Sequence, residues 1–119
     1  MKHSACLVGV ACAVLLAGCA ASMPPTELIS ARQAYEHASV GNAAELVPEE
    51  FRRAHEALQV AEKSFRNEPK SILTRDLAYL AYRKATLAAA LAITVSDSVV
   101  TAGASKDLQS AKTEIVKPR

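Results

Sequence analysis

Cysteine is scarce in this chain of 119 residues, and its placement excludes most of the roles that the residue can play. The three cysteines, Cys6, Cys12 and Cys19, all lie at the N-terminus. We expect residues 1–18 to leave as a signal peptide, so that the mature protein keeps Cys19 alone. A single thiol can form neither an intrachain disulfide nor a cysteine metal site.

Tryptophan is absent, glycine occurs only four times and the aromatic fraction is 4%. This composition disfavours a β-sandwich or barrel, whereas abundant alanine favours helices. A strong charge of one sign is also missing, because removing Lys2 with the signal leaves 13 basic residues against 12 acidic ones. We therefore expect no nucleic-acid partner.

The first nineteen residues have the layout of an export signal. Lys2 and His3 make a basic start, residues 7–16 are an uninterrupted apolar run, and small residues precede Cys19. The run is too short for a permanent transmembrane helix, which needs about 20 apolar residues. The segment is therefore predicted to direct export rather than to anchor the chain by itself.

Leu16-Ala17-Gly18-Cys19 resembles the bacterial lipobox. The resemblance implies that Cys19 carries a diacylglycerol and acyl chains, which attach the mature protein to a lipid bilayer, and we expect no other cofactor. Two or three chains suffice for stable anchoring. Ala20, where inner-membrane lipoproteins usually have Asp, implies the periplasmic face of the outer membrane. The alternative is a chance cysteine after an ordinary signal peptide.

Apolar residues spaced three and four apart predict helices in the mature chain. After a short tether, residues 19–25, Thr26 is predicted to cap a first helix. Gly41, in the left-handed conformation that often follows a helix, is predicted to end it. The apolar face of this helix consists of Leu28, Ala31, Tyr35 and Ala38.

A second helix is predicted from Pro48, a favourable first residue, to the turn that Pro69 imposes. Glu49–Arg53 and Glu62–Arg66 are spaced to form ion pairs along it. Its apolar face consists of Phe51, Ala54, Leu58, Ala61 and Phe65.

Ser71 is predicted to cap a third and longest helix that contacts both others. Two adjacent stripes run along it, one of leucines and one of alanines; they are Leu73, Leu77, Leu80, Leu87 and Leu91, and Ala78, Ala81, Ala85, Ala88 and Ala92. We expect Leu80, in the middle of its stripe, to be core. The uncharged stretch between Lys84 and Asp97 is too short to span a bilayer.

The predicted fold is all-α, an antiparallel helical hairpin or three-helix bundle with a long third helix. Beyond Val95 poor helix formers accumulate, so the helix is predicted to fray or end between about residues 96 and 103. The helical domain is then residues 26–103, and 104–119 is a partly helical tail. The first helix is too short to cover the third, which leaves a predicted docking surface at Ile93, Val95, Val99 and Val100.

The segments "PEEFRRAHEALQVAEKSF" and "TRDLAYLAYRKATLAAALA" resemble a bacterial family of helical domains of unknown function. Such domains are alanine-rich, occur on lipoproteins and often precede an OmpA-like peptidoglycan-binding domain. The resemblance covers about residues 26–100, and residues 76–85 are its most distinctive part. The 119 residues leave no room for an OmpA-like domain. A peptidoglycan partner is therefore unsupported, and the family offers no catalytic residues to carry over.

Signatures of catalysis and metal binding are not found in the sequence. His37 and His55 lie on different predicted helices, and zinc wants three or four ligands at defined spacing. Glu49 and Glu50 are explained by the positive end of a helix dipole, and Tyr79 and Tyr82 by packing. Arg83-Lys84 is interpreted as a solvated face. We expect neither an enzyme nor a metal protein.

Two functional classes remain. The first is a structural or interaction module of the bacterial cell envelope, which docks on another envelope protein, on the cell wall or on a second copy of itself. The second is a helical carrier or chaperone that holds an apolar ligand or an unfolded client beside the alanine stripe. An exposed apolar patch above a few hundred Å² between helices would favour the second class. We favour the first.

Overall fold

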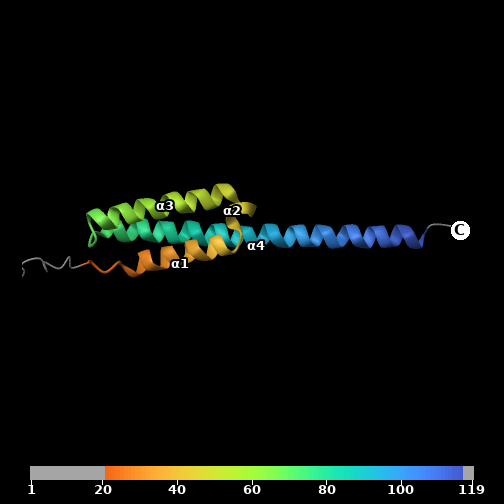
Figure 1. Cartoon of the computed structure of the whole chain (residues 1–119), viewed down its shortest axis with the longest axis horizontal. Coiled ribbons are helices and arrows are strands. Elements are labelled where there is room, and N and C mark those ends of the chain that lie inside the picture. Colours follow the sequence, from red (N-terminus) through yellow and green to blue (C-terminus); the bar gives the residue numbers. More distant parts are fainter. Residues whose placement is uncertain (1–20, 117–119) are drawn as a thin grey trace, which may run out of the picture.

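The chain is helical through most of residues 21–116, the part that the computed structural model describes. Its helices are α1 (Thr26–Val40), α2 (Ala43–Leu46), α3 (Pro48–Asn67) and α4 (Ile72–Ile115). Both α1 and α3 pack along the first half of α4 and contact each other less (Figure 1). The chain direction makes α3 antiparallel to α4 and α1 parallel to it. The all-helical prediction is confirmed, with α4 as the central member.

The helix ends predicted at Gly41, Pro48, Pro69 and Ser71 are confirmed, whereas the cap predicted at Thr26 is wrong. Pro48 is the first residue of α3, which ends at Asn67 just before the Glu68-Pro69 turn. The hydroxyl of Ser71 accepts a hydrogen bond of 3.1 Å from the backbone N–H of Leu73 and caps α4. Thr26, however, is the first helical residue, because the carbonyl of Pro25 already accepts the first hydrogen bonds of α1.

The turn after α1 also differs from its prediction. Asn42, not Gly41, takes the left-handed conformation, with φ 60° against −78° for the glycine. Asparagine tolerates that region better than most residues. A Cβ on Gly41 would lie 3.3 Å from the carbonyl oxygen of His37, a tight contact that the backbone would have to relax by a few tenths of an ångström. The turn leads into the short helix α2, which the sequence analysis did not predict.

The core of the bundle is built mainly from alanine. On α4 the buried residues recur every three or four positions, and we call the series Ala78, Ala81, Ala85, Ala88 and Ala92 the alanine seam. Small side chains at a helix contact allow the helix axes to approach closely. Larger side chains, half buried, flank the contacts; they are Leu46, Val47, Phe51, Leu58, Phe65, Leu77 and Tyr82.

The prediction that Leu80 is core is wrong. Its side chain is 48% exposed, and Leu73 and Leu87 of the same stripe are exposed to a similar degree. The alanine seam occupies the groove between α1 and α3, so the neighbouring leucine stripe is turned to the outer edge of α3. There Leu77 and Leu80 line a shallow groove with Val60.

The prediction that α4 frays between residues 96 and 103 is also wrong, because the helix continues to Ile115. Starting a helix is the costly step, whereas extending one costs little per residue. Packing in the bundle stabilises the first half of α4, and the helix can then extend through residues that are poor helix formers. α4 is therefore one continuous helix. Its last part, residues 93–115, projects beyond the bundle and is called the overhang below (Figure 1).

Candidate interaction surface

The overhang carries exposed apolar side chains that no other described helix covers. Ile93, Val99 and Val100 are exposed, as predicted, and Val95 is half buried at the edge of the bundle. The aliphatic side chains Leu108 and Ile115 are exposed as well. These two residues lie beyond the end that the sequence predicted for the helix. Leu108 and Ile115 lie 8 and 15 positions after Val100, which places them on the same helical face, and this spacing was the signal that could have found them.

Hydroxyl side chains on the overhang bond back to its own backbone. Thr101 donates to the carbonyl of Asp97 at 2.8 Å, and Ser105 donates to the carbonyl of Thr101 at 3.0 Å. The remaining bonds of this kind are made by Thr94, Ser98, Ser110 and Thr113. Such bonds satisfy the hydroxyls without solvent. These residues can therefore be covered by a partner without leaving a polar group unpaired.

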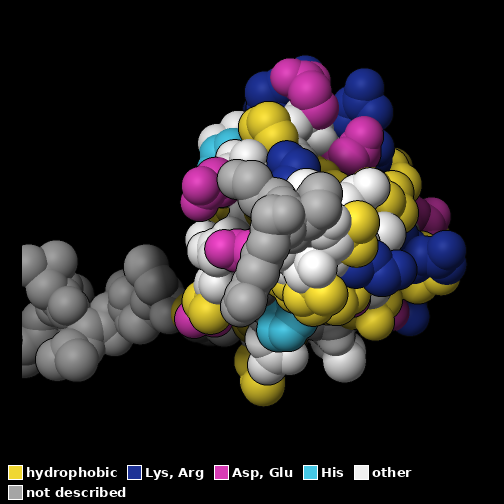
Figure 2. Space-filling view, turned by 90° about the vertical axis from the view of Figure 1, so that its right-hand side faces the viewer, with side chains coloured by type: hydrophobic (Ala, Val, Ile, Leu, Met, Phe, Trp, Pro, Cys, Tyr) yellow, Lys and Arg dark blue, Asp and Glu magenta, His cyan; other side chains and the backbone are white. Residues whose placement is uncertain are grey.

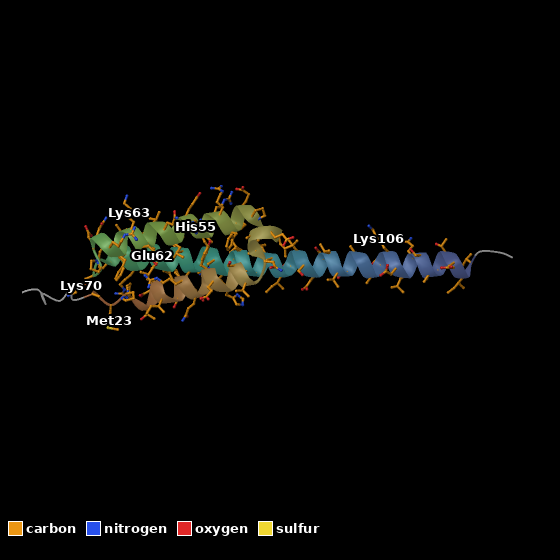
Figure 3. All side chains as sticks on the ribbon, in the orientation of Figure 1. Met23, His55, Glu62, Lys63, Lys70 and Lys106 are labelled. Carbon is orange, nitrogen blue, oxygen red and sulfur yellow. The ribbon has the colours of Figure 1, made fainter. Side chains whose placement is uncertain are left out.

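Two apolar stripes follow the overhang on opposite sides, counted at 100° per residue. Val95, Val99 and Ala102 extend the line of the alanine seam, which then meets the charge of Lys106 (Figure 3). We call the second set the outer stripe; it consists of Ile93, Val100, Ala104, Leu108, Ala111 and Ile115. Only the outer stripe runs the whole length of the overhang.

By length and composition α4 could cross a membrane, since an 18-residue window of it has a mean hydropathy of 1.6. The bundle, however, uses part of this apolar sequence, because Ala88, Ala89 and Ala92 are packed against α1–α3. Residues 93–105, before Lys106, are then about 20 Å long. The hydrocarbon core is about 30 Å thick. This segment of the overhang is therefore shorter than the hydrocarbon core.

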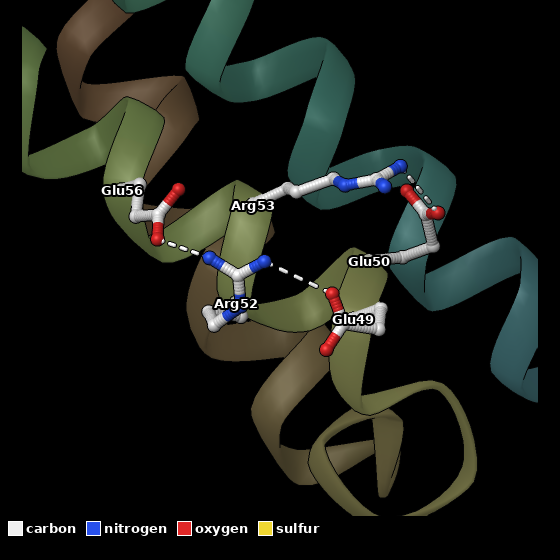
Figure 4. Close-up of polar contacts among 5 residues, drawn as sticks. All are labelled: Glu49, Glu50, Arg52, Arg53 and Glu56. Carbon is white, nitrogen blue, oxygen red and sulfur yellow. Dashed lines mark hydrogen bonds and ion pairs between the residues drawn. The ribbon is translucent and has the colours of Figure 1, made fainter.

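The bundle surface carries paired charges of both signs, which gather over α3 (Figure 2). Arg52 binds Glu49 at 2.9 Å and also Glu56, and Arg53 binds Glu50 at 3.0 Å (Figure 4). The hydrogen bond from Arg52 lowers the pKa of Glu49. The predicted Glu49–Arg53 pair is wrong. Glu49 pairs with Arg52 and Glu50 pairs with Arg53, in each case three positions further along α3.

Glu62 joins two helices instead of pairing along its own. Its carboxylate accepts two hydrogen bonds from Arg32 of α1, at 2.6 and 2.8 Å, where the sequence predicted Arg66. These bonds lower the pKa of Glu62. A second pair, Arg75 to Glu27 at 3.2 Å, joins α4 to α1, and the pKa of Glu27 is lowered first by its own backbone N–H and then by Arg75.

The candidate chemical groups are dispersed. The ring centroids of His55 and Tyr35 are 5.4 Å apart, and the Tyr35 ring stacks on Phe51. The Nε2 atom of His55 accepts a hydrogen bond from the Gln59 amide. Among residues 21–116, no three His, Cys, Asp or Glu side chains are grouped to hold a metal ion. The histidine here is part of an aromatic contact at the edge of α1 and α3.

Tyr79 and Tyr82 differ in burial. Tyr82 packs against the core, as predicted, whereas Tyr79 is 51% exposed and accepts a hydrogen bond of 3.0 Å from Arg83. Both rings line an open groove of about 340 Å³ between α1 and α4. The groove beside Leu77 and Leu80 holds about 230 Å³. The latter is below the range of about 300–1,000 Å³ of ligand pockets.

The predicted lipidation site is not part of this picture. Leu16, Ala17, Gly18 and Cys19 lie outside the described residues, and their modification stays a prediction.

Comparison with known proteins gives one result. A family model described as "Domain of unknown function (DUF4398)" matches residues 26–98, from the first residue of α1 to the base of the overhang. The match confirms the predicted resemblance to a helical domain family of unknown function. No curated protein and no solved structure matches the chain.

Proposed function

This chain belongs to the DUF4398 family of domains of unknown function, and we propose that it is a lipid-anchored interaction module of the bacterial outer membrane. Cys19 is its anchor, and the overhang is its docking surface. The observation that carries the proposal is the placement of the two ends of the described chain, residues 21–116. The chain enters the bundle at one end of the molecule, and the overhang leaves it at the other (Figure 1).

This arrangement supports presentation of the overhang away from a membrane. Only residues 20–25 separate Cys19 from α1, so the bundle stays close to an anchored cysteine. Met23, in this short connection, is 89% exposed and lies at the end of the molecule opposite Lys106 (Figure 3). From there α4 extends over about 66 Å at 1.5 Å per residue. An exposed apolar helix held at that distance is suited to contact another envelope component.

The anchor is tested by metabolic labelling with a fatty acid. The wild-type chain and Cys12→Ser, a matched control in the signal, should incorporate label, and Cys19→Ser should not. Equal label in all three chains contradicts the lipid anchor.

Docking is tested with Ile93→Glu combined with Val100→Glu, two exposed residues of the outer stripe. The double variant should melt like the wild type but lose its cross-linked partner in intact envelopes. Ala90→Glu, on an exposed residue of the bundle, adds charge as a control and should keep the partner. If the double variant unfolds, these residues are core; if the partner is retained, the docking surface lies elsewhere.

A carrier or chaperone is the alternative proposal. It draws support from the half-exposed leucines beside Val60, but the groove that they line is small. A fluorescent apolar probe that binds the wild type and is lost in Leu80→Glu would favour the carrier.

A further inference from the structure

The outer stripe has a repeat that distinguishes it from the alanine seam. From Ile93 to Ile115 the residues on this face are spaced by 4, 3, 4, 4, 3 and 4 positions, and Asp97 is the one charged member. The spacings of 4, 3 and 4 positions add up to an 11-residue repeat, and this repeat occurs twice. At 3.67 residues per turn, such a stripe stays straight or drifts slightly in the right-handed sense. The face is thus continuous over the whole overhang, about 34 Å.

The stripe is also symmetric about its centre. Ala104 is the middle member, Val100 and Leu108 lie four positions on either side, and Ile93 and Ile115 lie eleven positions on either side. A surface that binds itself across a two-fold axis must be self-complementary in this way. We infer that the partner of the outer stripe is a second copy of this chain, whose overhang packs antiparallel and crosses at Ala104.

The charges of the overhang favour the same partner and orientation. Among the described residues no ion pair includes Asp97 or Lys112, and neither has an opposite charge three or four positions away among them. In the antiparallel pair, Asp97 lies opposite Ala111 of the second copy and next to its Lys112, on the flank where the two helices meet. The symmetry produces this ion pair twice.

A parallel pair of overhangs would bring like charges together instead of opposite ones. In register, it places Asp97 against Asp97 of the second copy within an apolar stripe, and like charges in such a position oppose association. Charges beside a helical seam commonly set the orientation of the partner. The single aspartate therefore selects the antiparallel arrangement.

Steric and area considerations fit the antiparallel pair. Because each bundle lies at the base of its own overhang, the two bundles occupy opposite ends of the dimer and do not collide. Six apolar side chains per copy form a small interface compared with the roughly 800 Å² per partner of standard complexes. Association is therefore reversible and depends on concentration. This inference rests on the docking role proposed above and names its partner.

Oxidative cross-linking of single-cysteine additions in intact cells tests the register. Ala104→Cys should give a disulfide dimer well above the wild-type background, because Ala104 faces itself. Val100→Cys and Leu108→Cys should each give little dimer alone, but co-expressed they should link to each other. The inference is overturned if Ala104→Cys gives no dimer, or if Val100→Cys alone dimerises as strongly, which would indicate a parallel pair.

A charge exchange tests the orientation in the Ala104→Cys background. Asp97→Lys and Lys112→Asp should each reduce the cross-linked dimer at least fivefold, and the double variant should restore it. No rescue contradicts the ion pair and overturns the antiparallel register.

The outcomes separate this inference from the proposed function. If Ala104→Cys links only to a different protein, the docking role stands and self-association is wrong. If the dimer forms but Cys19→Ser still incorporates the fatty acid label, self-association stands and the lipid anchor is wrong. Binding of the wild-type chain to lipid vesicles through the overhang, without a dimer, overturns the inference in favour of a membrane surface.

Discussion

The covered half of α4 sorts its side chains by size, whereas the overhang leaves large and small side chains exposed alike. In the covered half, residues 72–92, the small alanines are buried and large residues such as Leu80 and Leu87 are half exposed. In the overhang, the aliphatic side chains of Val100 and Leu108 are exposed, with no helix of the same chain over them. The comparison shows that hydrophobicity along a helix does not identify the core. The distance to the neighbouring helix decides which size of side chain fits.

The charges of the two regions differ in the same way. In the bundle Arg32 binds Glu62 across helices, and the arginines of α3 bind glutamates of their own helix. On the overhang, the described ion pairs include neither Asp97 nor Lys112. These charged side chains of the bundle are paired within the chain, whereas the overhang exposes apolar and charged groups that a partner can contact.

The largest expected effect comes from enlarging a seam residue. Ala81→Leu inserts extra methyl groups where α4 is 1% exposed, and overpacking of this kind costs about 1–3 kcal/mol. Ala102→Leu makes the same change on the overhang and should alter the free energy of unfolding by about 0.5 kcal/mol or less. Urea denaturation measures both. Equal losses would mean that the two halves of α4 are equally covered.

A buried hydroxyl gives the next largest contrast. Thr74, at 0% exposure, donates to the carbonyl of Glu68 at 2.8 Å and shares a hydrogen bond of 2.7 Å with Ser64. Thr74→Val removes both hydrogen bonds, although the Glu68 carbonyl still accepts one from the Ser71 N–H. At about 0.5–1.5 kcal/mol for each lost bond, the change should cost about 1–3 kcal/mol. Thr94→Val is the matched change on the overhang, where water replaces the lost bond. Thermal melts should separate the two variants; coincident melts would contradict the assigned role of Thr74.

Leu80→Ala should have a smaller effect than either. Truncating a buried leucine costs about 2–5 kcal/mol, but about half of this side chain is already in water, so we expect about 1 kcal/mol or less. The variant is compared with Ala81→Leu in the same urea experiment. A larger loss for Leu80→Ala would show that the leucine stripe, not the alanine seam, forms the core.

The smallest effect concerns the ion pair between α1 and α3. Because Arg32 lowers the pKa of Glu62 in the folded state, the pair stabilises the fold above the ordinary glutamate pKa. This contribution is lost as pH falls through the lowered value. Both partners are partly exposed, so Glu62→Gln should cost only about 0.2–1 kcal/mol at pH 7.

The difference between Glu62→Gln and the wild type should shrink between pH 7 and pH 3, as pH falls below the ordinary glutamate pKa and toward the lowered pKa of Glu62. Asp107→Asn, on the overhang, provides the control and should not change the stability of the bundle at either pH. A Glu62→Gln penalty that persists unchanged at pH 3 would assign the effect to packing rather than to charge.

Much of the fold follows from local sequence. Pro48, Pro69 and Ser71 set helix ends through backbone chemistry that acts within a few residues. The apolar spacing of α1 and α3 also identified the faces that pack, because these helices have one apolar side each. The exposure of Ile93 and Val100 followed from helix length alone.

What the sequence could not decide depended on neighbours in space. α4 has apolar residues on two adjacent faces, and only the close approach of α1 and α3 determines that alanine, not leucine, is buried. Arg32 displaced Arg66 as the partner of Glu62 because two helices placed it within hydrogen-bonding distance. The overhang is helical because the bundle nucleates α4, although its own residues favour an end. Propensity and periodicity act along the chain, whereas burial, ion pairing and the continuation of α4 are decided by contacts between helices.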